Sequence, residues 1–422
     1  MTSKDYLKNF DKIWKAKCST HNKLPNILPA VRRIIVIGDV HGDYDQVLNC
    51  LKIGGVINDQ KQWIGGDTVV VQLGDQVDSC RAAGFCHLPN TTSNDKAEDI
   101  KILQFFTALH EDAAKAGGAV YSILGNHELM NVQGDMTYVS YENIMEFDKN
   151  YFKALDKRKK DFKPGNELAN FLACTRQMAL IIGSNLFVHA GIVPEIVTQY
   201  PNVNDLNKLL TLYLLGELET PHHFNDIFMS AQHSPLWNRV FGNVNNSIDK
   251  CKRLMKPLKD IYNVGKIYVG HTPQVSFGIK SSCNDKIWLA DNGVSRAFDD
   301  LDLNYKVIAK IDADTCIGCQ LCYIACLDGA HQCIHTNQGP CSAYHGKSDH
   351  GMNPRVDIKQ PILHSHDSNA ITSIPFVDED ECIGCNLCHL VCPVPGCLTM
   401  KEIPNAAGKE SWNDRIAKKT LL

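Results

Sequence analysis

The chain has 422 residues, 43 of them basic and 47 acidic, which gives a formal net charge of -4 at pH 7. This near balance creates no global field that would draw the chain to nucleic acid or to an anionic membrane. No run of eighteen apolar residues predicts a membrane span, and the charged N-terminus lacks the apolar core of a signal peptide. We therefore expect a soluble, cytoplasmic protein with no nucleic-acid or membrane partner, built from one large and one smaller domain.

The first predicted element is a short amphipathic helix. Tyr6, Phe10, Ile13 and Trp14 recur at helical spacing between residues 5 and 17. Such an apolar stripe is typical of a helix that packs on a neighbouring core. We interpret residues 1–29 as an N-terminal helical extension of the domain that follows.

From residue 32 one sequence pattern recurs, a short β-branched run that ends in Gly, Asp, Asn or His. The instances are "RRIIVIGDVHG", "DTVVVQLGDQVD", "AVYSILGNHE", "NLFVHAG", "KIYVGHT" and "KIWLADNG". Continuous apolar runs of this length predict strands that are covered on both faces, and residues 97–116 predict an intervening helix. Residues 30–300 are thus predicted to form a layered α/β domain.

The polar residues at these strand tips form a candidate metal site. Ligands at the carboxyl edge of such a sheet lie close together, and divalent cations prefer carboxylate, amide and imidazole donors. A pair of cations suits phosphoester hydrolysis, because one activates water while both neutralise developing charge. The candidate ligands, in chain order, are Asp39, His41, Asp75, Asn126, His189 and His271.

The same motifs carry a family resemblance. "GDVHG", "GDQVD", "GNHE", "HAG" and "GHT" resemble the calcineurin-like metallophosphoesterases, in particular the phosphoprotein phosphatases. "GNHELMNVQGDMTYVS", "SPLWNRV" and "DNGVSRAF" are similar to their Shewanella-like branch. The resemblance covers about residues 30–298 and implies a layered metallophosphoesterase sandwich with two divalent ions, manganese, iron or zinc. It implies that Asp39, His41 and Asp75 hold one ion, and Asp75, Asn126, His189 and His271 the other.

The resemblance also implies catalytic roles. His127 would be the general acid, oriented by Asp78, since an imidazolium needs a carboxylate to stay charged and aimed. Arg239 would clamp the phosphate. The sequence departs from the family where Ser79 replaces the arginine that usually follows "GDxVD". Arg81 either substitutes for that arginine or lies in solvent, and the sequence leaves both interpretations open.

Cysteine is distributed unevenly along the chain. Of the 18 cysteines, eleven lie at or after Cys316, which indicates metal ligands in a reducing compartment. Cys80 and Cys86, in the earlier loop "DSCRAAGFC", are either a redox-active pair or ordinary thiols, and we favour ordinary thiols because nothing near them in sequence would lower a thiol pKa.

Eight of the late cysteines form two runs with the same spacing. In such a run three thiolates bind one [4Fe-4S] cluster and the fourth reaches the other cluster, whereas a zinc site would use two pairs. We therefore expect two [4Fe-4S] clusters and interpret Cys333, Cys341 and Cys397 as non-ligands. The first cluster would take Cys316, Cys319, Cys322 and Cys392, and the second Cys382, Cys385, Cys388 and Cys326.

This region has a resemblance of its own. "LNYKVIAKID", "CIGCQLCYIACLDGAHQCIH" and "CIGCNLCHLVCPVPGCLTM" resemble the C-terminal ferredoxin-type domain of dihydropyrimidine dehydrogenases. The resemblance implies a small α+β ferredoxin-like domain at residues 301–405, followed by a polar tail at 406–422. The histidine-containing segment 331–376 is interpreted as a solvated loop. "YKVIAKID" also alternates well enough to supply one more strand to the preceding phosphatase fold.

These features favour a metal-dependent phosphatase acting on a phosphoprotein, with phosphate on Ser/Thr or Tyr, or on a phosphorylated small molecule. A dinucleoside polyphosphate hydrolase is the alternative on the same scaffold. An alternative of another class is an iron-sulfur electron-transfer protein with a redox partner, whose phosphatase domain only docks. The join near Phe298 to Leu303 is either a natural fusion or two reading frames joined in a gene model.

Overall fold

The computed structural model describes residues 7–81, 84–218, 221–244, 247–274 and 279–299, and in the C-terminal part 305–313, 315–317, 319, 321–323, 334–335, 375–377, 392–394 and 397–404. The chain divides into two compact units, residues 1–301 and 302–422, here called the N-terminal and C-terminal units. Within the described ranges, no helix is both long and apolar enough to cross a membrane.

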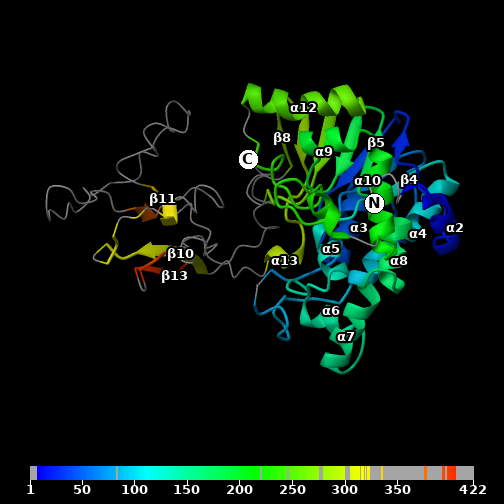
Figure 1. Ribbon diagram of the computed structural model, residues 1–422. Coiled ribbons are helices and arrows are strands. Elements are labelled where there is room, and N and C mark those ends of the chain that lie inside the picture. The colour runs from blue at the N-terminus through cyan, green and yellow to red at the C-terminus, as the bar shows by residue number, and fades with distance from the viewer. Residues whose placement is uncertain are drawn as a thin grey trace. The chain divides into compact units, whose positions relative to one another are not determined.

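Two sheets form the centre of the N-terminal unit (Figure 1). The smaller sheet has the order β2-β3-β4 and is wholly parallel, with Ile34 opposite Val69 and Val69 opposite Ala119. The larger sheet has the order β1-β5-β6-β7-β9-β8 and is mixed. The strands are β1 (Ile27–Leu28), β2 (Ile34–Ile37), β3 (Val69–Gln72), β4 (Ala119–Ser122), β5 (Ala179–Ile182), β6 (Asn185–Val188), β7 (Lys266–Val269), β8 (Lys280–Ser282) and β9 (Ile287–Leu289).

The two sheets pack face to face. Val71 and Tyr121 of the smaller sheet share one buried cluster with Leu180 and Phe187 of the larger sheet. Because each strand also carries apolar residues on its other face, both sheets need a second covering layer. Val70 and Val120 face that layer on the smaller sheet. Burial on both faces is as predicted for β3, β4 and β5, whereas β2, β7 and β9 are only partly buried.

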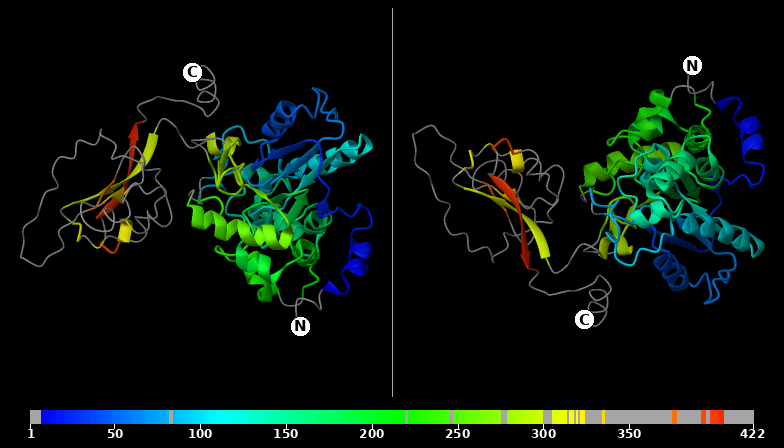
Figure 2. Two further views of the ribbon diagram at one scale, coloured as in Figure 1. Left: turned by 90° about the horizontal axis from the view of Figure 1, so that it is seen from above. Right: turned by 90° about the horizontal axis from the view of Figure 1, so that it is seen from below.

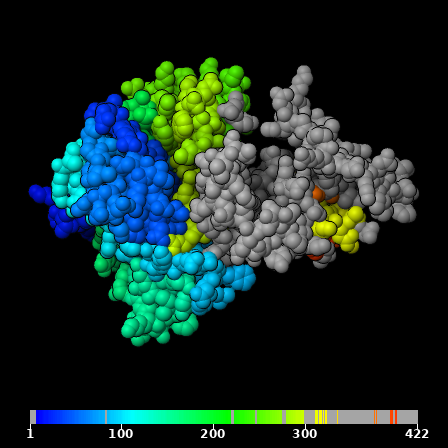
Figure 3. All heavy atoms as spheres, turned by 180° about the vertical axis from the view of Figure 1, so that it is seen from behind, coloured from blue at the N-terminus to red at the C-terminus, as the bar shows by residue number. Residues whose placement is uncertain are grey.

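Helices supply the outer layers. Phe106 of α4 packs on the free face of the smaller sheet, and Leu210 of α10 and Leu258 of α12 belong to the cluster on the free face of the larger sheet. In Figure 3 the blue segment around α3 and the green segment that holds α6 and α7 lie on one face of this unit. The helices are α3 (Tyr44–Ile53), α4 (Asp99–Lys115), α5 (Asn126–Val132), α6 (Tyr141–Met145), α7 (Tyr151–Phe162), α8 (Glu167–Thr175), α9 (Pro194–Gln199), α10 (Val203–Leu214), the 3-10 helix η1 (Pro221–Phe224), α11 (Asn225–Phe228), α12 (Ile248–Tyr262) and α13 (Arg296–Asp299).

The predicted N-terminal helix is interrupted by a turn at residues 8–9. α2 (Phe10–Lys17) buries Phe10 in the main core, and Ile13 and Trp14 pack against that core. The packing role predicted from their spacing is confirmed for these three residues. Tyr6 lies outside the described residues.

The described part of the C-terminal unit centres on a two-stranded antiparallel ladder. β10 (Tyr305–Ile311) pairs along its whole length with β13 (Leu398–Pro404), from Tyr305 opposite Pro404 to Ile311 opposite Leu398 (Figure 2). The short strands β11 (Ile334–His335) and β12 (Phe376–Val377) form a second pair. The prediction that "YKVIAKID" completes the phosphatase sheet is therefore wrong, because this ladder satisfies its backbone within the C-terminal unit.

Candidate active site

The polar strand tips of the N-terminal unit converge at one place, and glycines allow that approach. A Cβ on Gly125 would lie 2.1 Å from Asp75 Oδ1, and one on Gly270 would lie 2.2 Å from Asp39 Oδ1. Only glycine leaves room for a carboxylate at these distances. The recurrent Gly before Asn126 and His271 thus has a packing reason.

Asp75 lies at the centre of the cluster. Its Oδ2 is 3.7 Å from His41 Nε2, 3.4 Å from His189 Nε2 and 3.9 Å from His127 Nε2. Asp75 and His41 both adopt positive φ, at 52° and 37°. Backbone strain of this kind costs free energy and persists where the surroundings over-determine it, typically at functional sites.

A second group of donors surrounds Asn126. Its Oδ1 is 2.8 Å from both His189 Nε2 and His271 Nδ1. The other ring nitrogens are anchored by carbonyls, His189 Nδ1 at 2.8 Å from Leu73 O and His271 Nε2 at 2.9 Å from Trp237 O. These contacts fix the ring orientations, as in protein metal sites.

His127 is held by a buried polar network. Its Nδ1 is 2.8 Å from Asp78 Oδ2, whose partner Oδ1 accepts a 2.8 Å bond from Asn131. Arg158, fully buried on α7, donates to Asn131 Oδ1 at 2.9 Å and to Asp99 at 2.7 Å. His127 Nε2 is therefore the nitrogen that faces the Asp75 cluster.

Glu128 fixes the loop that carries Asp75. Its two carboxylate oxygens accept bonds from the backbone N–H groups of Asp75 at 3.0 Å, Gln76 at 2.6 Å and Gly125 at 2.7 Å. The side chain is buried with these donors, so it joins the ends of β3 and β4 into one rigid edge.

Ser79 and Arg81 occupy different environments. Ser79 is fully buried and accepts a 2.6 Å bond from Asn143, so it packs below the site and offers no cation. Arg81 is partly buried, with its guanidinium 5.6 Å from the ring of Tyr138 and 5.1 Å from that of Phe298. The charges of Asp75 and Asp78 act on it. These contacts favour substitution for the expected arginine over a solvated side chain.

Arg239 lies at the rim. Its Nη1 donates to the carbonyl oxygen of His271 at 2.7 Å, and its side chain is otherwise exposed. The cation is thus positioned next to the ligand cluster and remains accessible to an incoming anion.

Asp291, which sequence reasoning did not single out, also reaches this place. It follows β9, is 1% exposed, and acts electrostatically on Asp39. The sequence does contain a signal for Asp291, because "KIWLADNG" predicts a strand that ends in polar residues. Glu128 and Arg158 were missed as well, since nothing in their spacing distinguishes them from ordinary helical residues.

Charge shapes the site strongly. Burial, together with the charges of Asp291 and Asp75, raises the pKa of Asp39 well above its usual range. Burial opposes ionisation of Asp75 too, but the surrounding histidines, His189 foremost, hold the pKa of Asp75 well below its usual range. Burial lowers the pKa of His271. A neutral imidazole and an ionised carboxylate are the forms that bind cations.

The donor set fits a pair of divalent cations. Asp75, His189 and His271 offer ligand atoms within 4.8 Å of one another, as do His41, Asp75 and His127. Asp39 Oδ1 is a buried carboxylate oxygen with no hydrogen-bond partner among the described residues. Orphaned buried oxygens beside neutral imidazoles are what a cation would satisfy.

Six cysteines of the N-terminal unit are joined in disulfides. The pairs are Cys18–Cys174, Cys80–Cys86 and Cys251–Cys283. The interpretation of Cys80 and Cys86 as ordinary thiols is therefore wrong, and so is a uniformly reduced cysteine set. Local sequence gave no signal for the Cys18–Cys174 pair, whose partners lie 156 residues apart.

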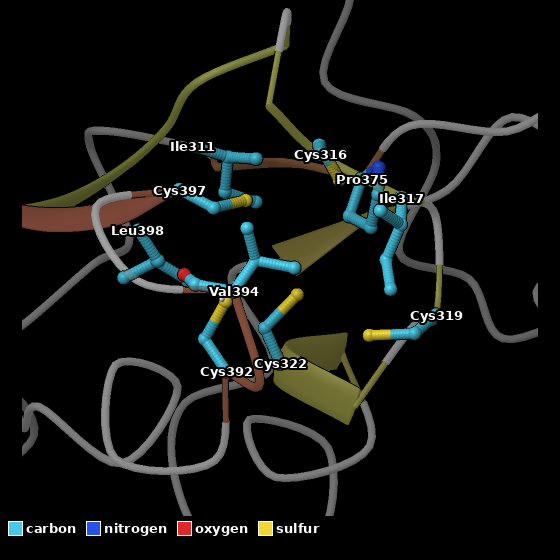
Figure 4. Close-up of a pocket in the computed structure, with 10 residues that line it drawn as sticks. All are labelled: Ile311, Cys316, Ile317, Cys319, Cys322, Pro375, Cys392, Val394, Cys397 and Leu398. Atoms are coloured by element: carbon cyan, nitrogen blue, oxygen red, sulfur yellow. Dashed lines mark hydrogen bonds between the residues drawn. The ribbon is translucent and has the colours of Figure 1, made fainter.

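In the C-terminal unit, thiols gather around one pocket (Figure 4). Cys316, Cys319, Cys322 and Cys392 line it, together with apolar side chains such as Ile311 and Leu398. Cys397, interpreted from the sequence as a non-ligand, lines the same pocket. Burial raises the pKa of Cys322 to about 11. Cys326, Cys382, Cys385 and Cys388, and also Cys333 and Cys341, lie outside the described residues.

Comparison with known proteins adds independent evidence. The family model of calcineurin-like phosphoesterases matches residues 32–275, and models of 4Fe-4S binding domains match residues 313–329 and 375–395. An uncharacterized protein of Acanthamoeba polyphaga mimivirus is 36% identical over 46% of this chain and 88% of its own length. Shewanella-like protein phosphatase 2 of Arabidopsis thaliana is 27% identical over 63% of this chain and 72% of its own.

Two further similarities concern the fold and the C-terminal unit. A solved cold-active protein tyrosine phosphatase superposes with a TM-score of 0.51 at 22% identity, covering 64% of this chain and 73% of the other. The PreA subunit of the NAD-dependent dihydropyrimidine dehydrogenase of Escherichia coli is 40% identical over 57 residues, 14% of each chain. Because the phosphoesterase match spans more than half of the sequence, this chain belongs to the calcineurin-like phosphoesterases, and its enzymatic activity is that of a phosphatase.

Proposed function

We propose that the N-terminal unit hydrolyses phosphomonoesters of phosphoproteins with the aid of two divalent cations. One observation carries the proposal, the convergence of ligand-type side chains from four other strand tips around Asp75 at the end of β3. Asp39, His41 and Asp75 would hold one ion, and Asp75, Asn126, His189 and His271 the other. Bound cations would supply an activated water and neutralise charge on the phosphate.

The side chains around this centre have separable roles. His127 presents Nε2 toward the cluster while Asp78 holds Nδ1 at 2.8 Å, which supports His127 as the proton donor to the leaving oxygen. Arg239 is anchored on the carbonyl of His271, which supports a role in binding phosphate oxygens with its outer nitrogens. Arg81 provides a second cation where the family has its usual arginine.

The surroundings favour an aromatic phosphoester. The ring of Tyr138 packs edge-on against His127 at 5.2 Å, and that of Phe298 packs against His41 at 5.7 Å. Both rings are partly exposed, so they form apolar walls for the group that carries the phosphate. Together with the likeness to a protein tyrosine phosphatase, this supports phosphotyrosine as the preferred residue over phosphoserine or phosphothreonine.

Asp39→Asn tests the proposal. We expect loss of activity on an aryl phosphate by about 10³-fold or more, with less bound metal, because one anionic ligand is removed. Asp67→Asn, at an exposed carboxylate paired with Arg32, is the matched control and should behave as wild type. Full activity of Asp39→Asn would contradict the proposal.

Substrate class is tested separately. Phosphotyrosine peptide, phosphoserine peptide and dinucleoside tetraphosphate are compared by kcat/KM with the same enzyme. The proposal predicts the highest value for phosphotyrosine. A preference for the dinucleoside tetraphosphate would establish the alternative hydrolase on the same scaffold.

For the C-terminal unit we propose two [4Fe-4S] clusters that exchange electrons with a redox partner. The convergence of Cys316, Cys319, Cys322 and Cys392 on one pocket supports the first cluster. The ligands of the second, Cys382, Cys385, Cys388 and Cys326, are proposed from their spacing. Anaerobic purification should yield a brown protein with acid-labile sulfide that is reduced reversibly, whereas a colourless protein would contradict the proposal.

A further inference from the structure

Asp291 has a bare carboxylate oxygen in the interior. It lies two residues after the end of β9, is 1% exposed, and its Oδ1 accepts a hydrogen bond from the N–H of Gly293 at 3.2 Å. Its Oδ2 has no hydrogen-bond partner within the described part of the chain. A buried carboxylate oxygen without a hydrogen-bond partner is unfavourable unless a proton or a cation compensates its charge.

Asp39 has the complementary feature. Its Oδ2 accepts the N–H of His271 at 2.9 Å, while its Oδ1 is the other orphaned oxygen of the site. The tips of β2 and β9 touch, since a Cβ on Gly38 would lie 2.1 Å from Ala290 O and 3.1 Å from Asp291 Cα. The two carboxylates lie within reach of each other and interact directly. Asp39 Oδ1 and Asp291 Oδ2, the two oxygens without a hydrogen-bond partner, therefore belong to one buried group of carboxylates, here called the carboxylate corner.

The nearest positive side chain does not satisfy this corner. Arg81 acts on Asp291 through its charge, but its hydrogen bonds go to the carbonyl oxygens of Asp78 at 3.3 Å and Cys80 at 2.8 Å. Asp75 adds a further negative charge that acts on Asp291. A buried corner with two carboxylate oxygens that lack a hydrogen-bond donor and no direct cationic partner has the composition of a hard-cation site.

We propose that Asp291 is an additional ligand of the metal centre, on the side of Asp39. The inference rests on the proposed dinuclear function and makes the two metal positions unequal. One would have the carboxylates of Asp39, Asp291 and Asp75 with the imidazole of His41. The other would have one shared carboxylate, the amide of Asn126 and two imidazoles. Carboxylate-rich sites suit Mn²⁺ and Mg²⁺, whereas imidazole suits Zn²⁺ and iron, so the donor set of the first position is the better match for Mn²⁺.

Asp291→Asn separates this role from a structural one. Apo and metal-loaded full-length protein are compared by equilibrium dialysis with Mn²⁺ alone and by calorimetric unfolding. We expect one of two Mn²⁺ affinities to fall about 10- to 100-fold while the other stays. The apo variant should unfold at the same or a higher temperature, because a buried repulsion is removed. Unchanged Mn²⁺ affinities, or a destabilised apo protein with both affinities intact, would overturn the proposal and leave Asp291 a turn residue.

Two controls keep the result interpretable. Glu98→Gln neutralises a buried carboxylate that bonds Lys101 and Tyr44 N, so it should lower apo stability and leave both Mn²⁺ affinities unchanged. Should Asp291→Asn not fold, Asp291→Glu is measured in its place, with the same loss of one affinity expected from a displaced oxygen. A wild-type protein that binds a single Mn²⁺ would refute the dinuclear function, whereas the Asp291 proposal would still be decided by the effect on that ion.

Discussion

The two units assemble their sites in opposite ways. In the N-terminal unit the ligand-type residues lie between positions 39 and 271, and extensive apolar clusters bring the strand tips together. In the C-terminal unit the pocket thiols come from two short stretches, and few apolar side chains of its described part are buried. The N-terminal unit, whose site is positioned by an apolar core, should stay folded without metal. The C-terminal unit, which is organised around thiols, should need its clusters to stay folded.

Cysteine usage follows the same division. The N-terminal unit joins six cysteines in three disulfides, which cross-link a fold that already has a core. The described cysteines of the C-terminal unit are thiols directed at one pocket. The same residue therefore acts as a covalent brace in one unit and as a candidate ligand in the other.

The largest expected effect separates chemistry from folding in the N-terminal unit. His127→Gln removes the proton donor, and we expect kcat on a phosphopeptide to fall about 10²- to 10⁴-fold. The melting temperature should stay within a few degrees, because glutamine keeps an N–H donor for the buried carboxylate of Asp78. His110→Gln, at a half-buried histidine outside the site, serves as the control for activity. Equal losses of kcat in both variants would show that the effect of His127→Gln comes from the fold and not from a lost proton donor.

In the C-terminal unit, loss of one cysteine ligand should instead destabilise the fold around the pocket. Cys322→Ser removes a buried thiol of the pocket, and we expect less acid-labile sulfide and faster proteolysis after residue 301. Phosphatase activity should remain within about twofold of wild type, because no ligand of the N-terminal site is touched. Cys50→Ser, at a thiol of the N-terminal unit, is the matched control. Retained sulfide in Cys322→Ser would contradict the assignment of the pocket.

The smallest effect concerns the disulfide that ties α2 to α8. Cys174→Ser opens a loop of 156 residues, and we expect the free energy of unfolding to drop by about 2–4 kcal/mol with kcat unchanged. Denaturant unfolding of wild type and variant measures the difference. In the presence of dithiothreitol the two proteins should become equally stable, and a difference that persists under reduction would assign the effect to packing.

Much of this arrangement could be predicted from sequence, for reasons that particular residues show. Asp39, Asp75, Asn126, His189 and His271 each follow an apolar run, and parallel strands bring such tips to one edge of the sheet. Local pattern could not choose a partner for "YKVIAKID", because its ladder partner lies about ninety residues later. It gave no sign of Cys18–Cys174 for the same reason.

Asp291 and Arg81 could not be assigned for a different reason, because their local sequence is compatible with more than one role. Asp291 in "ADNG" looks like an ordinary turn residue until its neighbour across the two sheets, Asp39, is known. Arg81 could not be placed, since its environment is formed by Tyr138 and Phe298 from far along the chain. In both cases the missing information was tertiary.

If the two units carry independent chemistries, a paired treatment of the full-length protein should separate them. Protein purified anaerobically is treated either with a chelator of divalent cations or with mild oxidation, followed by phosphatase assay and by metal and sulfide analysis. We expect the chelator to abolish phosphatase activity while sulfide is retained, and oxidation to remove sulfide while activity is retained. Activity that survives the chelator and disappears with the sulfide would contradict this independence.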